Sequence, residues 1–151
     1  MLPSISICVP AYKRTDYLKR LLDSVALQTY KNFEVIITDD SPDNSIEELC
    51  NSYIGQFKLY YFKNLTNLNT PENWNEAVRK SNYEWIKIIH DDDWFAHKDS
   101  LLNYAEAISK QPHIDFFFSA YTNVYEGTNI EKQVFLSSFW KYVLSLSLIH
   151  I

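Results

Sequence analysis

The sequence predicts an α/β fold in which a mostly parallel sheet is flanked by helices. Short apolar runs of strand length alternate along the chain with segments whose apolar residues recur at helical spacing. Such alternation builds βαβ units, which place their strands parallel in one sheet. The chain has 151 residues, 46% hydrophobic and 22% charged, which suits one ordered domain and argues against disorder.

The expected strands are runs of apolar, β-branched or aromatic residues. They cover residues 5–9, 33–38, 58–62, 84–89 and 115–121. Each of the first four is followed by a helical pattern, beginning with Leu18, Leu21, Leu22 and Val25 in a helix expected over residues 15–28.

The other expected helices carry start signals or an apolar face. Ser45 to Glu48 fits a capping box, and Thr70 with Pro71 fits an N-cap followed by a proline at the first helical position. Leu101 and Ala105 lie on the apolar face of the last of these helices. Phe135, Phe139, Trp140 and Leu144 suggest one more helix near the end of the chain.

Composition and charge exclude several classes of protein. The only glycines are Gly55 and Gly127, so a glycine-rich phosphate loop cannot be built. The net charge of −5 disfavours binding to nucleic acid, which needs a basic surface. No apolar stretch is long enough to span a bilayer and no signal peptide is recognisable, so we expect a cytoplasmic protein, placed at the inner face of the membrane if a further segment anchors it.

Unusual polar clusters follow three of the expected strands. They are residues 10–14 (Pro-Ala-Tyr-Lys-Arg), Asp39 with Asp40 and Ser41, and residues 90–94 (His-Asp-Asp-Asp-Trp). Ligands of open parallel sheets bind outside the carboxyl ends of the strands, so these clusters are expected to face one cleft.

The acidic triplet Asp91, Asp92 and Asp93 needs compensation for its charge. Two like charges about 4 Å apart repel by about 4 kcal/mol at an effective dielectric constant of 20. Mg²⁺ or Mn²⁺ would relieve this repulsion and would also supply the phosphate contact that glycines cannot. The alternative is a solvated acidic turn that caps the next helix.

The other two clusters also have two interpretations. A carboxylate at Asp39 or Asp40 can accept hydrogen bonds from a base or a ribose, or it can form an Asx turn into Ser41. Tyr12 can stack on a nucleobase, and Lys13 and Arg14 can meet phosphates, or all three can be ordinary surface residues.

Together these motifs resemble the N-terminal half of family 2 glycosyltransferases, whose fold is the Rossmann-like GT-A fold. The similarity lies in the Pro-x-Tyr-x-Arg loop, the Asp-Asp-Ser motif and the acidic DxD-like cluster, in that order. Residues 28–35 resemble the family's linker into its second strand, and Asn73-Trp74-Asn75 with residues 90–94 resembles one subset of the family. Tyr83 departs from the glycine often found before the fourth strand.

The resemblance implies a role for each matching residue. Pro10, Ala11, Tyr12 and Arg14 would surround the base, while Asp40, with Asp39 beside it, would bond the uracil ring. Asp91 would reach the ribose. The divalent ion, Mn²⁺ or Mg²⁺, would be held by Asp91, Asp92 and Asp93, with Asp92 as the principal ligand.

The implied function is inverting transfer of a sugar from a nucleotide-diphosphate sugar, expected to be UDP-linked, to a hydroxyl group of a carbohydrate or lipid-linked acceptor. Residues 1–130 would be the nucleotide-sugar-binding domain, and residues 131–151 would begin a truncated C-terminal portion. Residues 146–151 resemble a translated sequencing adapter and are interpreted as an artefact. The acceptor half, with the catalytic base, is expected to be missing.

Two alternatives remain. One is a non-catalytic fragment that binds nucleotide and metal. The other is a Mg²⁺-dependent receiver domain, which would need acids after its first and third strands and a lysine after its fifth, whereas here the acids follow the second and fourth.

Overall fold

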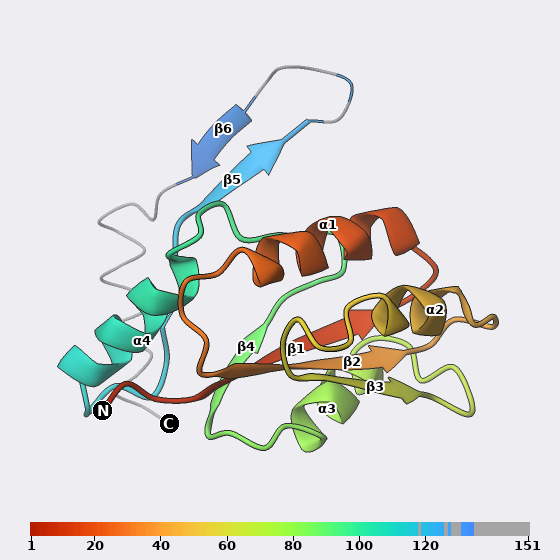
Figure 1. Cartoon of the computed structure of the whole chain (residues 1–151), viewed down its shortest axis with the longest axis horizontal. Helices are drawn as coiled ribbons and strands as arrows, with labels where there is room; N and C mark the ends of the chain where they lie inside the picture. Colours follow the sequence, from red (N-terminus) through yellow and green to blue (C-terminus); the bar gives the residue numbers. More distant parts are fainter. Residues whose placement is uncertain (118, 126, 128–130, 135–151) are drawn as a thin grey trace. The chain divides into compact units, whose positions relative to one another are not determined.

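A four-stranded parallel sheet organises the first part of the chain (Figure 1). The computed structural model describes residues 1–117, 119–125, 127 and 131–134. The strands of the sheet are β1 (Ile5–Ala11), β2 (Phe33–Asp39), β3 (Leu59–Lys63) and β4 (Trp85–Ile88), in the spatial order β3-β2-β1-β4. Every neighbouring pair is parallel, which confirms the predicted parallel α/β architecture.

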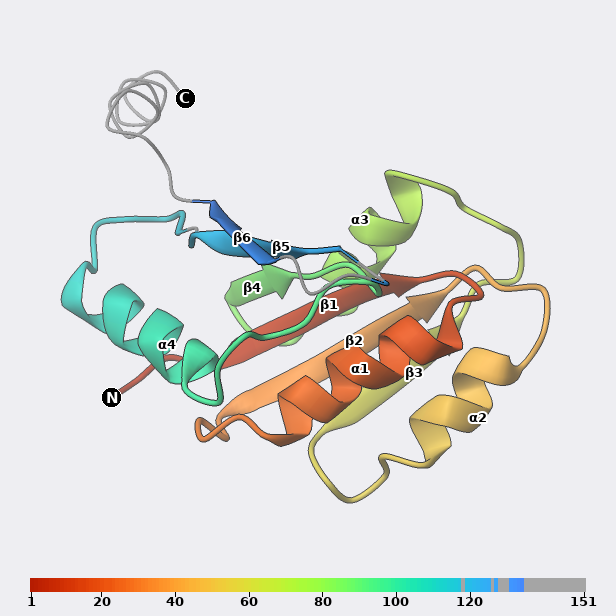
Figure 2. The same cartoon turned by 90° about the horizontal axis from the view of Figure 1, so that it is seen from above.

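Helices cover both faces of this sheet (Figure 2). They are α1 (Thr15–Ala26), α2 (Ser45–Asn51), α3 (Glu72–Arg79) and α4 (Ser100–Lys110). On the face of α1 and α2, the main core joins Ile7 and Val9 of β1 to Leu21 and Leu22 of α1. On the opposite face, Cys8 and Ile36 pack with Ala77 of α3. Residues of β1 alternate between these two cores because successive side chains of a strand point to opposite faces.

The strand β1 continues past the end of its neighbour β4. The β1–β4 ladder pairs Ile5 with Trp85 and ends at Cys8 and Ile88, whereas the β1–β2 ladder continues to Ala11. Pro10 has no backbone N–H to donate, and it lies in this last stretch, where the ladder with β4 has already ended. The ladder therefore leaves the last residues of β1 without a paired strand on the β4 side, among the described residues.

The structure divides the chain into two compact units, residues 1–114 and residues 115–151. In the second unit, β5 (Tyr121–Val124) pairs antiparallel with β6 (Glu131–Val134). The division comes before the predicted functional boundary after residue 130, which stays a prediction. The helix expected around Phe135 to Leu144 and the segment 146–151 lie outside the described residues.

The prediction of a fifth strand over residues 115–121 is wrong. Among the described residues of this stretch, only Tyr121 belongs to a strand, and that strand is part of the separate antiparallel pair. A short run that contains Phe116 and Phe117 predicts burial, but it does not specify which strand will pair with it.

Two predicted helix starts also need correction. Ser45 is the first residue of α2 rather than its cap, and Asp43 Oδ1 accepts the Ser45 backbone N–H at 3.0 Å. Likewise α3 begins at Glu72, one residue later than Thr70 and Pro71 predicted. Among the described residues, none of the helices combines the length and the apolar character that crossing a membrane requires.

Candidate functional site

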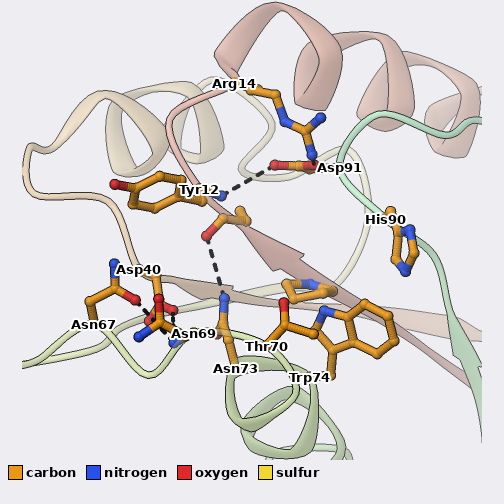
Figure 3. A pocket seen from close by; sticks show the side chains of 12 residues that line it. Tyr12, Arg14, Asp40, Asn67, Asn69, Thr70, Asn73, Trp74, His90 and Asp91 are labelled. Carbon is orange, nitrogen blue, oxygen red and sulfur yellow. Dashed lines mark hydrogen bonds and ion pairs between the residues drawn. The ribbon is translucent and has the colours of Figure 1, made fainter.

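A pocket of about 310 Å³ lies at the carboxyl ends of β1, β2 and β4, where the sequence predicted a cleft (Figure 3). The loop before α3 and the first turns of α3 complete its wall. The lining residues are Pro10, Ala11, Tyr12, Arg14, Asp40, Asn67, Asn69, Thr70, Asn73, Trp74, His90 and Asp91.

Six of the predicted site residues therefore share one cavity although they come from three separate segments of the chain, at the carboxyl ends of β1, β2 and β4. They are Pro10, Ala11, Tyr12, Arg14, Asp40 and Asp91. Asp39, Asp92 and Asp93 are not among the lining residues. Asp92 and Asp93 directly follow the lining residue Asp91, whereas Asp39 has a different environment, described below.

The loop after β1 is fixed by the loop after β2. Asp40 donates its backbone N–H to the carbonyl of Ala11 at 3.1 Å, and Lys13 donates its backbone N–H to Ser41 Oγ at 2.8 Å. Lys13 has a φ of 64°, a left-handed conformation that is costly for a lysine and persists only where surrounding contacts hold it. Tyr12 is 43% exposed beside the pocket, and Lys13 Nζ lies over its ring, 4.8 Å from the ring centroid.

Asp91 connects the loop after β4 to the loop after β1. Its Oδ2 accepts the Tyr12 backbone N–H at 3.2 Å, and its Oδ1 is paired with Arg14 Nη2. The side chain is only 3% exposed. Burial raises the pKa of Asp91 above its ordinary value, although the Tyr12 N–H and the Arg14 guanidinium oppose that shift by favouring the carboxylate.

Arg14 also reaches the next carboxylate, with 2.7 Å between its Nη1 and Asp92 Oδ2. Partial burial lowers the pKa of Arg14, but the adjacent Asp91 and Asp92 outweigh it and the net shift is upward. The guanidinium is therefore a permanent cation that bridges two members of the acidic triplet.

Three side chains beside the pocket suit a divalent cation. One ligand atom each from His90, Asp92 and Asp93 lies within 4.8 Å of the others. The imidazole of His90 packs against Trp74 of α3, with 4.6 Å between the ring centroids. Two carboxylates and an imidazole fit Mn²⁺ well and Mg²⁺ through the carboxylates. This set retains Asp92 and Asp93 of the predicted ligands and adds His90, while the oxygens of Asp91 are engaged by Tyr12 and Arg14.

Asp40 organises the opposite wall of the pocket. Its Oδ1 accepts the side-chain amide of Asn64 at 2.7 Å and the backbone N–H of Leu68 at 3.1 Å. Its Oδ2 accepts the backbone N–H of Asn69 at 2.8 Å. Asn69 has a φ of 59°, a conformation that asparagine tolerates better than most residues. Asp40 thus holds the loop that carries Asn67, Asn69 and Thr70 into the pocket.

Asp39 is buried behind this wall and forms the Asx turn that the sequence left as an alternative. Its Oδ1 accepts the backbone N–H of Ser41 at 2.7 Å, while its Oδ2 accepts Tyr61 Oη at 2.7 Å and Lys63 Nζ at 2.9 Å. The geometry gives Asp39 a supporting position, and its predicted contact with nucleotide stays a prediction.

Half of the pocket lining was not predicted as site residues. These are Asn67, Asn69, Thr70, Asn73, Trp74 and His90. The sequence does carry a signal for them, because four asparagines, Asn64, Asn67, Asn69 and Asn73, follow the third strand within ten residues. Carboxamides both donate and accept hydrogen bonds, so their density after a strand end indicates a polar binding wall.

Comparison with known proteins identifies the class to which this fold and site belong. The family described as "Glycosyl transferase family 2" matches residues 6–147. The chain belongs to this family, and its fold is the GT-A fold. Membership of this family excludes the alternative of a receiver domain.

Individual relatives are similar over most of the chain. An uncharacterized glycosyltransferase of Haemophilus influenzae is 35% identical over 115 residues, which cover 76% of this chain and 37% of that protein. The abequosyltransferase RfbV of Salmonella typhimurium is 35% identical over 103 residues, which cover 64% of this chain and 30% of RfbV. The chain thus spans about a third of the length of these relatives.

A solved structure agrees with the fold. Residues 1–349 of S. aureus TarS, crystallised in complex with UDP, align with a TM-score of 0.66 and 28% identity, covering 72% of this chain and 33% of that one. The same TarS fragment has also been crystallised in complex with UDP-GlcNAc.

Proposed function

We propose that this chain is the donor-binding portion of a glycosyltransferase that transfers a sugar from a UDP-sugar to a hydroxyl group, with inversion and with the help of Mn²⁺ or Mg²⁺. The acceptor would be a carbohydrate or a lipid-linked saccharide, and the reaction would take place in the cytoplasm, at the inner face of the membrane. Membership of family 2 and the UDP complexes of TarS support the choice of reaction and nucleotide.

One observation carries the proposal: the pocket gathers the three loops that the family motifs occupy. Tyr12 and Arg14 come from the first loop, Asp40 from the second and Asp91 from the third, and all four line the same cavity. A solvated acidic turn or a set of unrelated surface residues would not require this convergence.

The pocket offers complementary groups for each part of a nucleotide. The exposed ring of Tyr12 would stack on the base, which in other base-binding sites contributes about 1–3 kcal/mol. The carboxamides of Asn67 and Asn69 lie beside Asp40, where polar edges of the base would find donors and acceptors. Asp91 and Arg14 lie on the other side of Tyr12, toward the ribose and the phosphates in this arrangement.

His90, Asp92 and Asp93 would hold the divalent cation. When bound, the cation would neutralise the negative charge that develops on the departing diphosphate. Asp91 would keep the first and third loops in register for this purpose, because it bonds the Tyr12 backbone and Arg14 at once. We place the base that deprotonates the acceptor outside this portion of the enzyme.

Thermal unfolding with and without ligands tests the proposal. We expect UDP and UDP-sugars to raise the melting temperature, and Mn²⁺ to increase that rise, because a ligand that binds only the folded state stabilises it by mass action. Asp92→Asn should abolish the part of the rise that depends on Mn²⁺. The matched control is Glu84→Gln, which removes one exposed negative charge before β4, away from the pocket.

The outcomes are distinct. Stabilisation by UDP-sugar together with sugar transfer to an acceptor supports the full proposal. Stabilisation without transfer supports a donor-binding fragment that lacks turnover. No effect of any nucleotide diphosphate, with or without Mn²⁺, would overturn the assignment of the pocket.

A further inference from the structure

Arg14 takes part in two kinds of interaction that compete with each other. Its side chain lines the pocket, and its guanidinium is also paired with Asp91 and Asp92. Asp92 is at the same time one of the three side chains that suit a divalent cation.

We propose that Arg14 is the internal counter-ion of the acidic triplet and competes with the divalent cation for Asp92, so that metal binding releases one arm of the guanidinium toward the diphosphate. This inference rests on the metal dependence in the proposed function and adds a residue-level mechanism to it.

The two ion pairs of Arg14 differ in their surroundings. Asp91 is 3% exposed and has a second bond from the Tyr12 backbone, so the carboxylate side of the Arg14–Asp91 pair is buried and anchored, although Arg14 itself is 48% exposed. Asp92 is 40% exposed, and its pair with Arg14 Nη1 is open to solvent and to ions. Exposed pairs are weak and exchange readily, whereas breaking a buried pair leaves an uncompensated charge. The divalent cation would therefore break the pair with Asp92 and not the pair with Asp91.

Charge explains why a cation at Asp92 weakens the hold of the guanidinium on the same carboxylate. The triplet carries three negative charges and Arg14 one positive charge, which leaves an excess of two that a divalent cation matches. A carboxylate oxygen that coordinates Mg²⁺ lies about 2.1 Å from the ion. A guanidinium nitrogen 2.7 Å from that same carboxylate would then lie close to a doubly charged cation.

The part of the guanidinium released from Asp92 would be free to bind the diphosphate. Arg14 precedes the first residue of α1, and the N-terminus of a helix together with a guanidinium suits a diphosphate. Because Nη2 stays with Asp91, the guanidinium turns about a fixed point instead of leaving the site. Metal and donor would thereby bind with positive cooperativity, since each removes a competitor of the other.

The first test measures Mn²⁺ binding without nucleotide, using electron paramagnetic resonance of the free ion and the whole chain. Arg14→Gln should raise Mn²⁺ affinity about tenfold, because one nearby charge shifts ionic equilibria by an order of magnitude or more. Arg14→Lys should stay close to wild type because it keeps the charge. Arg79→Gln is the matched control: Arg79 also bridges two carboxylates, Glu72 and Glu76, but it does not line the pocket, and its loss should have no effect.

The second test uses UDP. With saturating Mn²⁺, Arg14→Gln should weaken UDP binding about tenfold, so the same substitution moves the two affinities in opposite directions. A merely structural role of Arg14 would lower both affinities together, and that result would overturn the proposal.

A third measurement is made on the wild-type protein, with the Arg14→Lys variant used only for assignment. In wild-type protein, the side-chain NMR signals of Arg14, assigned by their absence in Arg14→Lys, should change when Mg²⁺ is added without nucleotide. Unchanged signals at a Mg²⁺ concentration that stabilises the protein would overturn the competition. If UDP binds independently of any divalent cation, metal dependence itself fails, and the inference fails with it while the donor pocket stands.

Discussion

The carboxylate of Asp40 accepts the backbone N–H of Asn69 at 2.8 Å, which ties the loop after β2 to the loop before α3. By family resemblance Asp40 is a direct contact of the base, yet most of its hydrogen-bonding capacity is spent inside the protein. Oδ1 has two donors and Oδ2 has one, so one lone pair of Oδ2 remains to meet an N–H of a ligand. The main role of Asp40 is therefore to support the loop that carries Asn67 and Asn69 into the pocket.

Asp40→Asn should therefore weaken both folding and nucleotide binding. An amide accepts at only one oxygen, so at least one N–H of the loop loses its partner, and we expect a loss of about 1.5–3 kcal/mol in the free energy of unfolding. UDP affinity should fall because Asn67 and Asn69 lose their fixed positions. Urea unfolding and calorimetric titration measure the two effects. Glu84→Gln, at an exposed position that does not line the pocket, is the control; weaker binding with unchanged stability would indicate direct contact only.

Asp39→Asn should reduce stability without changing the affinity of the folded protein for UDP. Asp39 is fully buried and accepts three hydrogen bonds, one of them from Lys63 Nζ. Removing one partner of a buried pair costs about 3 kcal/mol or more. Tyr61→Phe removes a single donor to the same carboxylate and should cost less, about 1.5 kcal/mol. A fall in UDP affinity without loss of stability would instead support the predicted contact between Asp39 and nucleotide.

His90→Ala should weaken Mn²⁺ binding at least about tenfold, since even residues that only orient a metal ligand have effects of 10- to 100-fold. The loss should be smaller for Mg²⁺, which prefers oxygen ligands. Equilibrium dialysis with each ion makes the comparison. His97→Ala removes an exposed imidazole that does not line the pocket and should leave both affinities unchanged. Equal losses for the two ions would place His90 outside the coordination sphere.

Cys8 and Cys50 should resist thiol reagents in the folded protein. Burial raises the pKa of each thiol from 9.0 to about 12, so the reactive thiolate fraction at pH 8 is on the order of 10⁻⁴. Because these pKa values are higher in the folded state, their contribution to stability is complete below about pH 9 and is lost as the pH rises toward 12. Labelling by iodoacetamide with and without urea, and unfolding curves between pH 8 and 11, check both statements. Rapid labelling of the native protein would contradict the first.

Much of the fold could be predicted because its elements have strong local signals. The apolar runs of β1 and β2 are buried along their whole length, so nearly continuous hydrophobicity marked them clearly. Strand boundaries were less certain at β1, where Pro10 and Ala11 continue the ladder with β2 despite the proline. Residues 115–121 were misassigned because pairing depends on a partner strand that local sequence does not reveal.

The predictable part of the site consists of the clusters that follow strand ends. Topology alone brings Tyr12, Asp40 and Asp91 to one edge of the sheet. The sequence did not reveal which of two adjacent aspartates faces the ligand. Asp39 is buried and does not line the pocket, whereas Asp40 lines it. That difference depends on Tyr61 and Lys63 of β3 and on Asn64 directly after it, all more than twenty residues away in the chain.

The position of β1 between β2 and β4 has a consequence for synthesis on the ribosome. β2 begins about two dozen residues after the end of β1, but β4 begins some fifty residues after the start of β2. At the usual 5–20 residues per second, a nascent chain spends several seconds with one side of its central strand unpaired. An unpaired edge invites pairing with other chains, so the interval before β4 emerges is when a chaperone would protect this protein best.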